Sequence, residues 1–166
     1  MQRIRRLILR KKLVVAVLIL TLALIWGQSV LNRSRSAQES NWVFEKLESV
    51  LRFFVGDELA TEVKLRKIAH FGEFFLLGSE AMLLAFLLGK SDARSLVAVF
   101  LLVNFCALLD ETIQIFSKRG SMVSDVWIDT AGAVTGILFM LYLRAVWSTL
   151  KENMAERRRI REGDRR

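Results

Sequence analysis

The sequence predicts an all-α integral membrane protein: a four-helix bundle with an additional amphipathic helix on the extracytoplasmic side. Three observations predict this class. Of the 166 residues, 53% are hydrophobic and none is proline. The apolar residues are concentrated in four stretches, each close to the roughly 20 residues that a helix needs to cross a hydrocarbon core. The net charge of +8 comes largely from Lys and Arg that flank these stretches.

The placement of charge and cysteine excludes several other classes. Basic residues beside apolar spans set membrane topology, so we expect no nucleic-acid partner. The single cysteine, Cys106, lies inside an apolar stretch, which excludes an internal disulfide and a cysteine-based zinc site. We expect one membrane domain at 13–147, a basic cytoplasmic arm at 1–12 and a basic cytoplasmic tail at 148–166.

The first span is expected at about Leu13–Leu31, as a retained helix rather than a cleaved signal peptide. The chain then becomes polar. In segment 40–56, apolar residues recur at helical spacing, which predicts an amphipathic helix with the apolar positions Val43, Leu47, Val50, Leu51 and Phe54. This helix either lies on the outer surface of the bilayer or packs over the bundle as a lid or spacer.

Three further spans are expected at about Ile68–Leu88, Leu96–Phe116 and Val126–Trp147. The loop before the third span should be cytoplasmic, and the loop at 117–124 should face outward. This topology puts 16 of the 25 Lys and Arg residues inside, so both termini are expected in the cytoplasm. Membrane lipids are therefore expected partners, and a homo-oligomer remains open.

Polar residues within the spans are the most informative feature, because each charge near the bilayer centre costs about 2.5 to 3.5 kcal/mol. They are concentrated at the expected outer ends of three spans. The second span carries Lys67, His70 and Glu73; the third carries Asp110, Glu111 and Gln114; the fourth carries Asp125 and Asp129. The three helices should therefore present polar groups at one depth.

A helical wheel places the polar residues of each span on one face. On the second span, His70, Glu73 and Glu80 lie within an arc of about 80°. On the fourth, Asp125 and Asp129 continue into Gly132 and Gly136, which predicts close helix packing. Lys67 and Arg119 are the expected counter-charges for the acids.

Three hypotheses explain such a cluster. It is an outward-facing pocket for a polar headgroup, a structural network that holds the helices in register, or a membrane-embedded metal-dependent hydrolase or transferase. His70 and Glu73 resemble half of a carboxylate-bridged metal site. A single histidine weakens that interpretation, so we expect no bound metal, no cofactor, and binding rather than catalysis.

The polar residues form three ordered motifs: Lys-x-x-His-Phe at 67–71, Asp-Glu-x-x-Gln at 110–114, and Arg-x5-Asp-x6-Gly from Arg119 through Asp125 to Gly132. Together these motifs resemble those of the VanZ-like family of small membrane proteins. It implies a multi-pass protein of the bacterial cytoplasmic membrane, in a family named for a member that gives low-level resistance to the glycopeptide teicoplanin. It implies no reaction.

By resemblance, the ligand is a lipid-linked cell-wall precursor or a glycopeptide-type headgroup, and the family's polar signature coincides with the cluster described above. The chain departs from that signature at Phe74, where many members carry tyrosine, at Ile113, where they carry histidine, and at Asp129, where they carry asparagine. The loss of a second histidine argues further against a metal, and Asp129 adds a negative charge.

Overall fold

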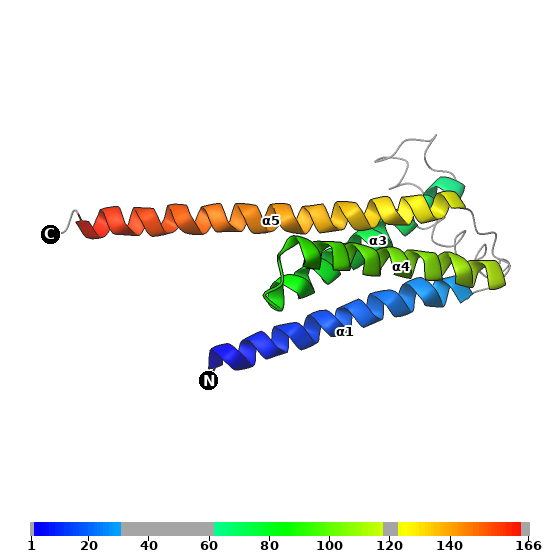
Figure 1. Ribbon diagram of the computed structural model, residues 1–166, viewed down its shortest axis with the longest axis horizontal. Helices are drawn as coiled ribbons and strands as arrows, with labels where there is room; N and C mark the ends of the chain where they lie inside the picture. Colours follow the sequence, from blue (N-terminus) through cyan, green and yellow to red (C-terminus); the bar gives the residue numbers. More distant parts are fainter. Residues whose placement is uncertain (1, 31–61, 118–122, 164–166) are drawn as a thin grey trace.

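The computed structural model describes residues 2–30, 62–117 and 123–163. These ranges contain four helices and no strand: α1 (Gln2–Val30), α3 (Glu62–Leu87), α4 (Ala93–Phe116) and α5 (Val123–Gly163), which lie alongside one another (Figure 1). The all-α prediction is confirmed. The predicted amphipathic segment 40–56 and Arg119 lie outside the described residues.

Each helix contains a stretch that is long and apolar enough to cross a membrane: Ile4–Val30, Arg66–Leu87, Ala93–Phe116 and Ser124–Ile160. Two helices extend beyond the expected spans. Helix α1 includes most of the basic arm, and α5 continues past Trp147 to Gly163. The α1 extension is rich in Arg, Lys and Leu and the α5 extension in Arg and Glu, all of which favour helix, and neither contains proline.

The turn between α3 and α4 sets the two helices antiparallel. Gly89, with φ of 75°, follows the end of α3, and the amide of Lys90 donates to the carbonyl of Ala85, which is the Schellman pattern. Asp92 then precedes α4 and accepts a hydrogen bond from the Ser95 hydroxyl, which lowers the pKa of the Asp92 carboxyl. The start of α3 and the end of α4 therefore lie at the same end of the bundle.

Helix α3 packs most extensively against α5, and glycines allow their backbones to approach closely. A Cβ atom at Gly132 would lie 2.3 Å from the carbonyl oxygen of Phe71, and one at Gly136 would lie 2.1 Å from that of Phe75. Gly78 of α3 lies against Ala133 in the same way. This contact fixes α3 relative to α5 beside their polar residues.

The outer surface of the bundle is apolar. Leu20, Leu101 and Leu138 are each more than half exposed, while the interior contains Phe74 and Val103. Exposed leucine over so much of a helical surface suits contact with acyl chains, since lipid tails are as apolar as leucine. The two termini lie at one end of the bundle, and the start of α5 lies at the other (Figure 1).

Candidate functional site

Seven polar or charged residues are buried among the described residues, near the end of the bundle that lies away from the termini. We call this set the polar cluster: Ser29, His70, Asp110, Glu111, Gln114, Asp125 and Asp129. All except Ser29 are sequence-predicted site residues. All four described helices contribute to the polar cluster, with Ser29 on α1 and His70 on α3.

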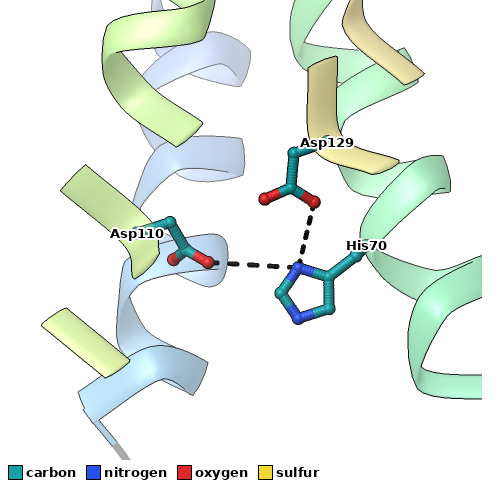
Figure 2. A group of neighbouring side chains, drawn as sticks. All are labelled: His70, Asp110 and Asp129. Carbon is teal, nitrogen blue, oxygen red and sulfur yellow. Dashed lines mark ion pairs between the residues drawn. The ribbon is translucent and has the colours of Figure 1, made fainter. Parts of the chain in front are cut away.

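The centre of the polar cluster is His70, which points between two carboxylates (Figure 2). Its Nδ1 atom lies 3.2 Å from Oδ1 of Asp129 and 4.0 Å from Oδ2 of Asp110. The three residues come from α3, α5 and α4 respectively. Asp110 and Asp129 are completely buried and His70 is 6% exposed, so the group is shielded from solvent and lipid alike.

The Asp110 carboxylate is held by hydrogen bonds on both oxygens. The hydroxyl of Ser29 donates to Oδ1 at 2.5 Å, and Nε2 of Gln114 donates to Oδ2 at 2.7 Å. Ser117 in turn donates from its hydroxyl to the Ser29 carbonyl at 2.7 Å, which joins the ends of α1 and α4. These contacts fix the orientation of Asp110 toward His70.

Asp129 has a different environment. Neither of its carboxylate oxygens accepts a hydrogen bond from a described residue, and Nδ1 of His70 likewise lacks a hydrogen-bond partner with acceptable angles in that part of the chain. The 3.2 Å separation is therefore an ion-pair distance without hydrogen-bond geometry. A completely buried carboxylate without donors is costly, because burial removes its hydration.

Asp125, one helical turn before Asp129, is neutralised by a neighbour. Nη2 of Arg66 lies 3.3 Å from its Oδ2, and the Ser124 hydroxyl donates to its Oδ1 at 3.3 Å. The expected counter-charges were Lys67 and Arg119. Among the described residues, Lys67 is half-buried and makes no ion pair, so the cation at Asp125 is Arg66.

The remaining predicted residues lie around this centre. Glu111 is buried beside Asp110 on α4, and Glu73 is half-buried about one turn after His70 on α3. Gly132 and Gly136 form part of the α3–α5 contact described above. The structure therefore brings together residues from all three predicted spans.

Sequence reasoning missed Ser29 and Arg66. Arg66 carried a detectable signal, because it precedes His70 by four residues and so shares its helical face. Ser29 carried little signal, since a serine in a membrane helix commonly bonds to the carbonyl four residues earlier, and Ser29 also does this at Ile25. Its contact with Asp110 joins residues 81 positions apart.

The centre of the polar cluster can also be described as a set of metal ligands. One ligand atom from each of His70, Asp110 and Asp129 lies within 4.8 Å of the other two. No bound metal was expected, because the chain has a single histidine. A metal site made of one imidazole nitrogen and carboxylate oxygens needs only one histidine.

Comparison with known proteins identifies the family. The model of the VanZ/LLP1 family matches residues 13–145. The chain belongs to the VanZ/LLP1 family. The resemblance inferred from the polar motifs is confirmed, and the match includes all of α3 and α4, parts of α1 and α5, and the whole polar cluster of this VanZ/LLP1 protein. The comparison with curated proteins found no match, and neither did the comparison with solved structures.

Membership in the VanZ/LLP1 family and the four helices together make this a multi-pass membrane protein. Neither observation assigns a ligand or a reaction to the polar cluster. That question rests on the chemistry of the buried side chains.

Proposed function

We propose that this VanZ/LLP1 protein binds the polar headgroup of a cell-envelope molecule in its polar cluster. The protein lies in the bacterial cytoplasmic membrane with both termini in the cytoplasm, and the polar cluster faces outward. The ligand is a lipid-linked cell-wall precursor or a glycopeptide such as teicoplanin. The observation that carries the proposal is Asp129, which is completely buried and accepts no hydrogen bond from a described residue.

The energetic argument starts from the cost of burial. A charge within a membrane span costs about 2.5 to 3.5 kcal/mol near the bilayer centre, and such residues are normally paired or functional. At the centre of the polar cluster, two carboxylates face one imidazole. A ligand that supplies hydrogen-bond donors or positive charge to Asp129 would offset this cost, as hydroxyls and amines of a sugar-bearing headgroup do.

A structural network explains part of the polar cluster but not all of it. Asp110 has hydrogen bonds on both oxygens, and Asp125 has Arg66, so both residues hold helices together. Asp129 accepts no hydrogen bond from a described residue and lies only at ion-pair distance from the His70 imidazole, and evolution of a bundle for stability alone favours an apolar residue at such a position. The binding hypothesis accounts for the difference.

Drug susceptibility of cells and ligand binding by the purified protein test the proposal together. Cells that express the wild-type chain should survive higher teicoplanin concentrations than cells with an empty vector. Asp129→Asn, which keeps the shape and removes the charge, should return survival to the vector level. The matched control is Glu80→Gln, which changes a carboxylate of α3 outside the polar cluster.

The binding measurement uses purified protein in lipid nanodiscs, with teicoplanin and a polyprenyl-diphosphate-linked sugar as probes. Anionic phosphatidylglycerol serves as the probe for charge alone. Saturable binding of either headgroup probe that Asp129→Asn abolishes supports the proposal. Equal binding by the wild type, Asp129→Asn and Glu80→Gln, with unchanged expression, would contradict it.

Orientation is tested separately with single cysteines in a Cys106→Ser background. The distribution of Lys and Arg supports a cytoplasmic loop at Ser91 and an outward loop at Ser121. A membrane-impermeant maleimide added to intact cells should therefore label Ser121→Cys and leave Ser91→Cys unlabelled. Labelling of Ser91→Cys from outside would reverse the topology and exclude an outward-facing polar cluster.

A further inference from the structure

We infer that His70, Asp110 and Asp129 bind one divalent metal ion, of the kind that accepts mixed nitrogen and oxygen ligands, such as Zn²⁺ or Mn²⁺. The inference rests on the proposed function in placing the ligand site at the centre of the polar cluster. It adds that a divalent metal ion binds at this site before the headgroup does. We call these three residues the metal-ligand group.

The geometry of the metal-ligand group is close to that of an occupied site. In a tetrahedral zinc site with bonds of about 2.0–2.2 Å, neighbouring ligand atoms are about 3.4 Å apart. Here Nδ1 of His70 lies 3.2 Å from one carboxylate oxygen and 4.0 Å from another, and all three ligand atoms lie within 4.8 Å. Bringing the widest separation, at most 4.8 Å, to about 3.4 Å takes a shift of up to about 1.4 Å, which rotation of the carboxylate side chains would supply.

The unpartnered atoms are those that a metal ion would use. Nδ1 of His70 and both oxygens of Asp129 lack a hydrogen-bond partner among the described residues, and they face one another inside the bundle (Figure 2). The side chains are buried to more than nine-tenths. Buried polar atoms are normally satisfied, and a cation bound between these three atoms would satisfy them.

Charge balance also favours a divalent ion. Two ionised carboxylates, a neutral imidazole and one divalent cation sum to zero, whereas the same carboxylates with a protonated imidazole retain a negative charge. Buried charges are tolerated when they are paired or coordinate a metal. A neutral site is cheaper to place between membrane helices.

The surroundings of Asp110 resemble those of a metal ligand. Ser29 and Gln114 each donate to one of its oxygens, at 2.5 Å and 2.7 Å, and Oδ2 keeps a second lone pair for a metal. Ligating carboxylates are characteristically held by such hydrogen bonds, which orient them before the ion arrives.

Three protein ligands leave a coordination position open. Zinc sites that act on a bound molecule have this arrangement, with a water or substrate atom in the fourth position. An oxygen of an anionic headgroup, such as a phosphate, fits that position. The metal would thus bridge the carboxylates of the protein to a ligand that they would otherwise repel.

Metal content and affinity test the inference on the full chain, purified in detergent and stripped with EDTA. After addition of ZnCl₂ or MnCl₂ and removal of excess metal, mass spectrometry of the metal should find one ion per chain. Titration calorimetry should show that Asp129→Asn and His70→Ala weaken binding by about 100-fold, and that Ser29→Ala weakens it by about 10-fold. Glu80→Gln should bind as the wild type does.

A second variant guards against simple misfolding. His70→Cys in a Cys106→Ser background keeps a ligand at the site but replaces nitrogen with sulfur. With Co²⁺ as the probe, this variant should gain a thiolate-to-cobalt absorption band that the Cys106→Ser parent lacks. A wild-type chain that binds no stoichiometric metal, or a Co²⁺ spectrum without the new band, overturns the inference.

The headgroup measurement separates this inference from the proposed function. If EDTA-stripped protein binds the headgroup probes as strongly as metal-loaded protein, the metal inference fails and the proposed function stands. If one metal binds per chain but neither probe binds, the metal site stands and the headgroup proposal fails. Metal-dependent binding of a probe supports both.

Discussion

The two ends of the helical bundle bury different kinds of side chain between the same helices: charged and polar at one end, apolar at the other. At the end away from the termini, α3 buries His70 against Asp110 and Asp129. Toward the other end, the same helix buries Ala81, Met82 and Ala85. Apolar side chains are therefore sufficient to pack α3 into the bundle, and the charge in the polar cluster is not a requirement of packing.

The surroundings of the Arg and Lys side chains also differ between the two ends of the bundle. In the polar cluster, Arg66 pairs with a carboxylate that is 2% exposed. At the opposite end, the Arg144 guanidinium lies 4.4 Å from the centre of the Phe86 ring, and Lys90 is exposed. An apolar groove of about 230 Å³ also lies in this half, between α1, α3 and α4, with Leu18, Leu84 and Leu102 in its lining. Of this groove and the polar cluster, the polar cluster has the chemistry to discriminate among polar ligands.

Removal of Arg66 should have the largest effect on stability. Arg66→Met leaves Asp125 buried without its cation, and loss of one partner of a buried ion pair costs 3–5 kcal/mol. Because Arg66 is 26% exposed, we expect about 3 kcal/mol, at the low end of that range. Unfolding by SDS titration in mixed micelles measures the change in the free energy of unfolding.

Lys67→Met is the matched control for Arg66→Met. Lys67 is the neighbouring cation and makes no ion pair with a described residue, so the free energy of unfolding should change by less than about 0.5 kcal/mol. Equal losses in the two variants would mean that net charge, not the Arg66–Asp125 pair, stabilises this end of the bundle.

Arg66 also shows how far the sequence could be interpreted. At about 100° per residue, Arg66 lies between His70 and Glu73 on the helical wheel, whereas Lys67 lies about 60° beyond His70. The helical wheel therefore placed Arg66, the cation that pairs with Asp125, on the same face as His70. Lys67 was expected instead because it is a cation at the outer end of the second span, and a position along the chain does not reveal which acid a side chain contacts.

Other features were predictable to different degrees. The four spans followed from hydropathy because each apolar stretch is long enough to be unambiguous. The gathering of His70, Asp110 and Asp129 at one depth followed from their positions within the spans. Their distances did not follow, because they depend on the rotation and register of three helices that no local pattern determines.

The hydrogen bond from Ser29 to Asp110 is a contact between distant parts of the chain that no local sequence pattern predicts. Ser29→Ala removes the donor to Oδ1 of Asp110 and leaves Gln114 as its partner. Hydrogen bonds to charged groups contribute about 1.5–3 kcal/mol, so we expect a loss of about 2 kcal/mol in the free energy of unfolding. The same SDS titration measures it.

Asp110→Asn tests whether this loss comes from the Ser29–Asp110 contact. In the double variant Ser29→Ala, Asp110→Asn, the two losses should be less than additive, because Asp110→Asn removes the negative charge that strengthens the hydrogen bond from Ser29. Strict additivity would show that the two residues stabilise the bundle independently and that their contact contributes nothing.

The smallest effect is expected in the half of the bundle toward the termini, where the Thr21 hydroxyl donates to Oε1 of Glu80 at 3.0 Å. Thr21→Val keeps the side-chain shape and removes the donor. Hydrogen bonds between membrane helices average about 0.6 kcal/mol, so the loss should be close to that value and well below that of Ser29→Ala. Glu80 is only partly buried, which allows water or headgroups to replace the lost donor. A loss for Thr21→Val as large as that for Ser29→Ala would show that both halves of the bundle depend equally on polar contacts for stability. The polar cluster would then not differ from the other half in this respect.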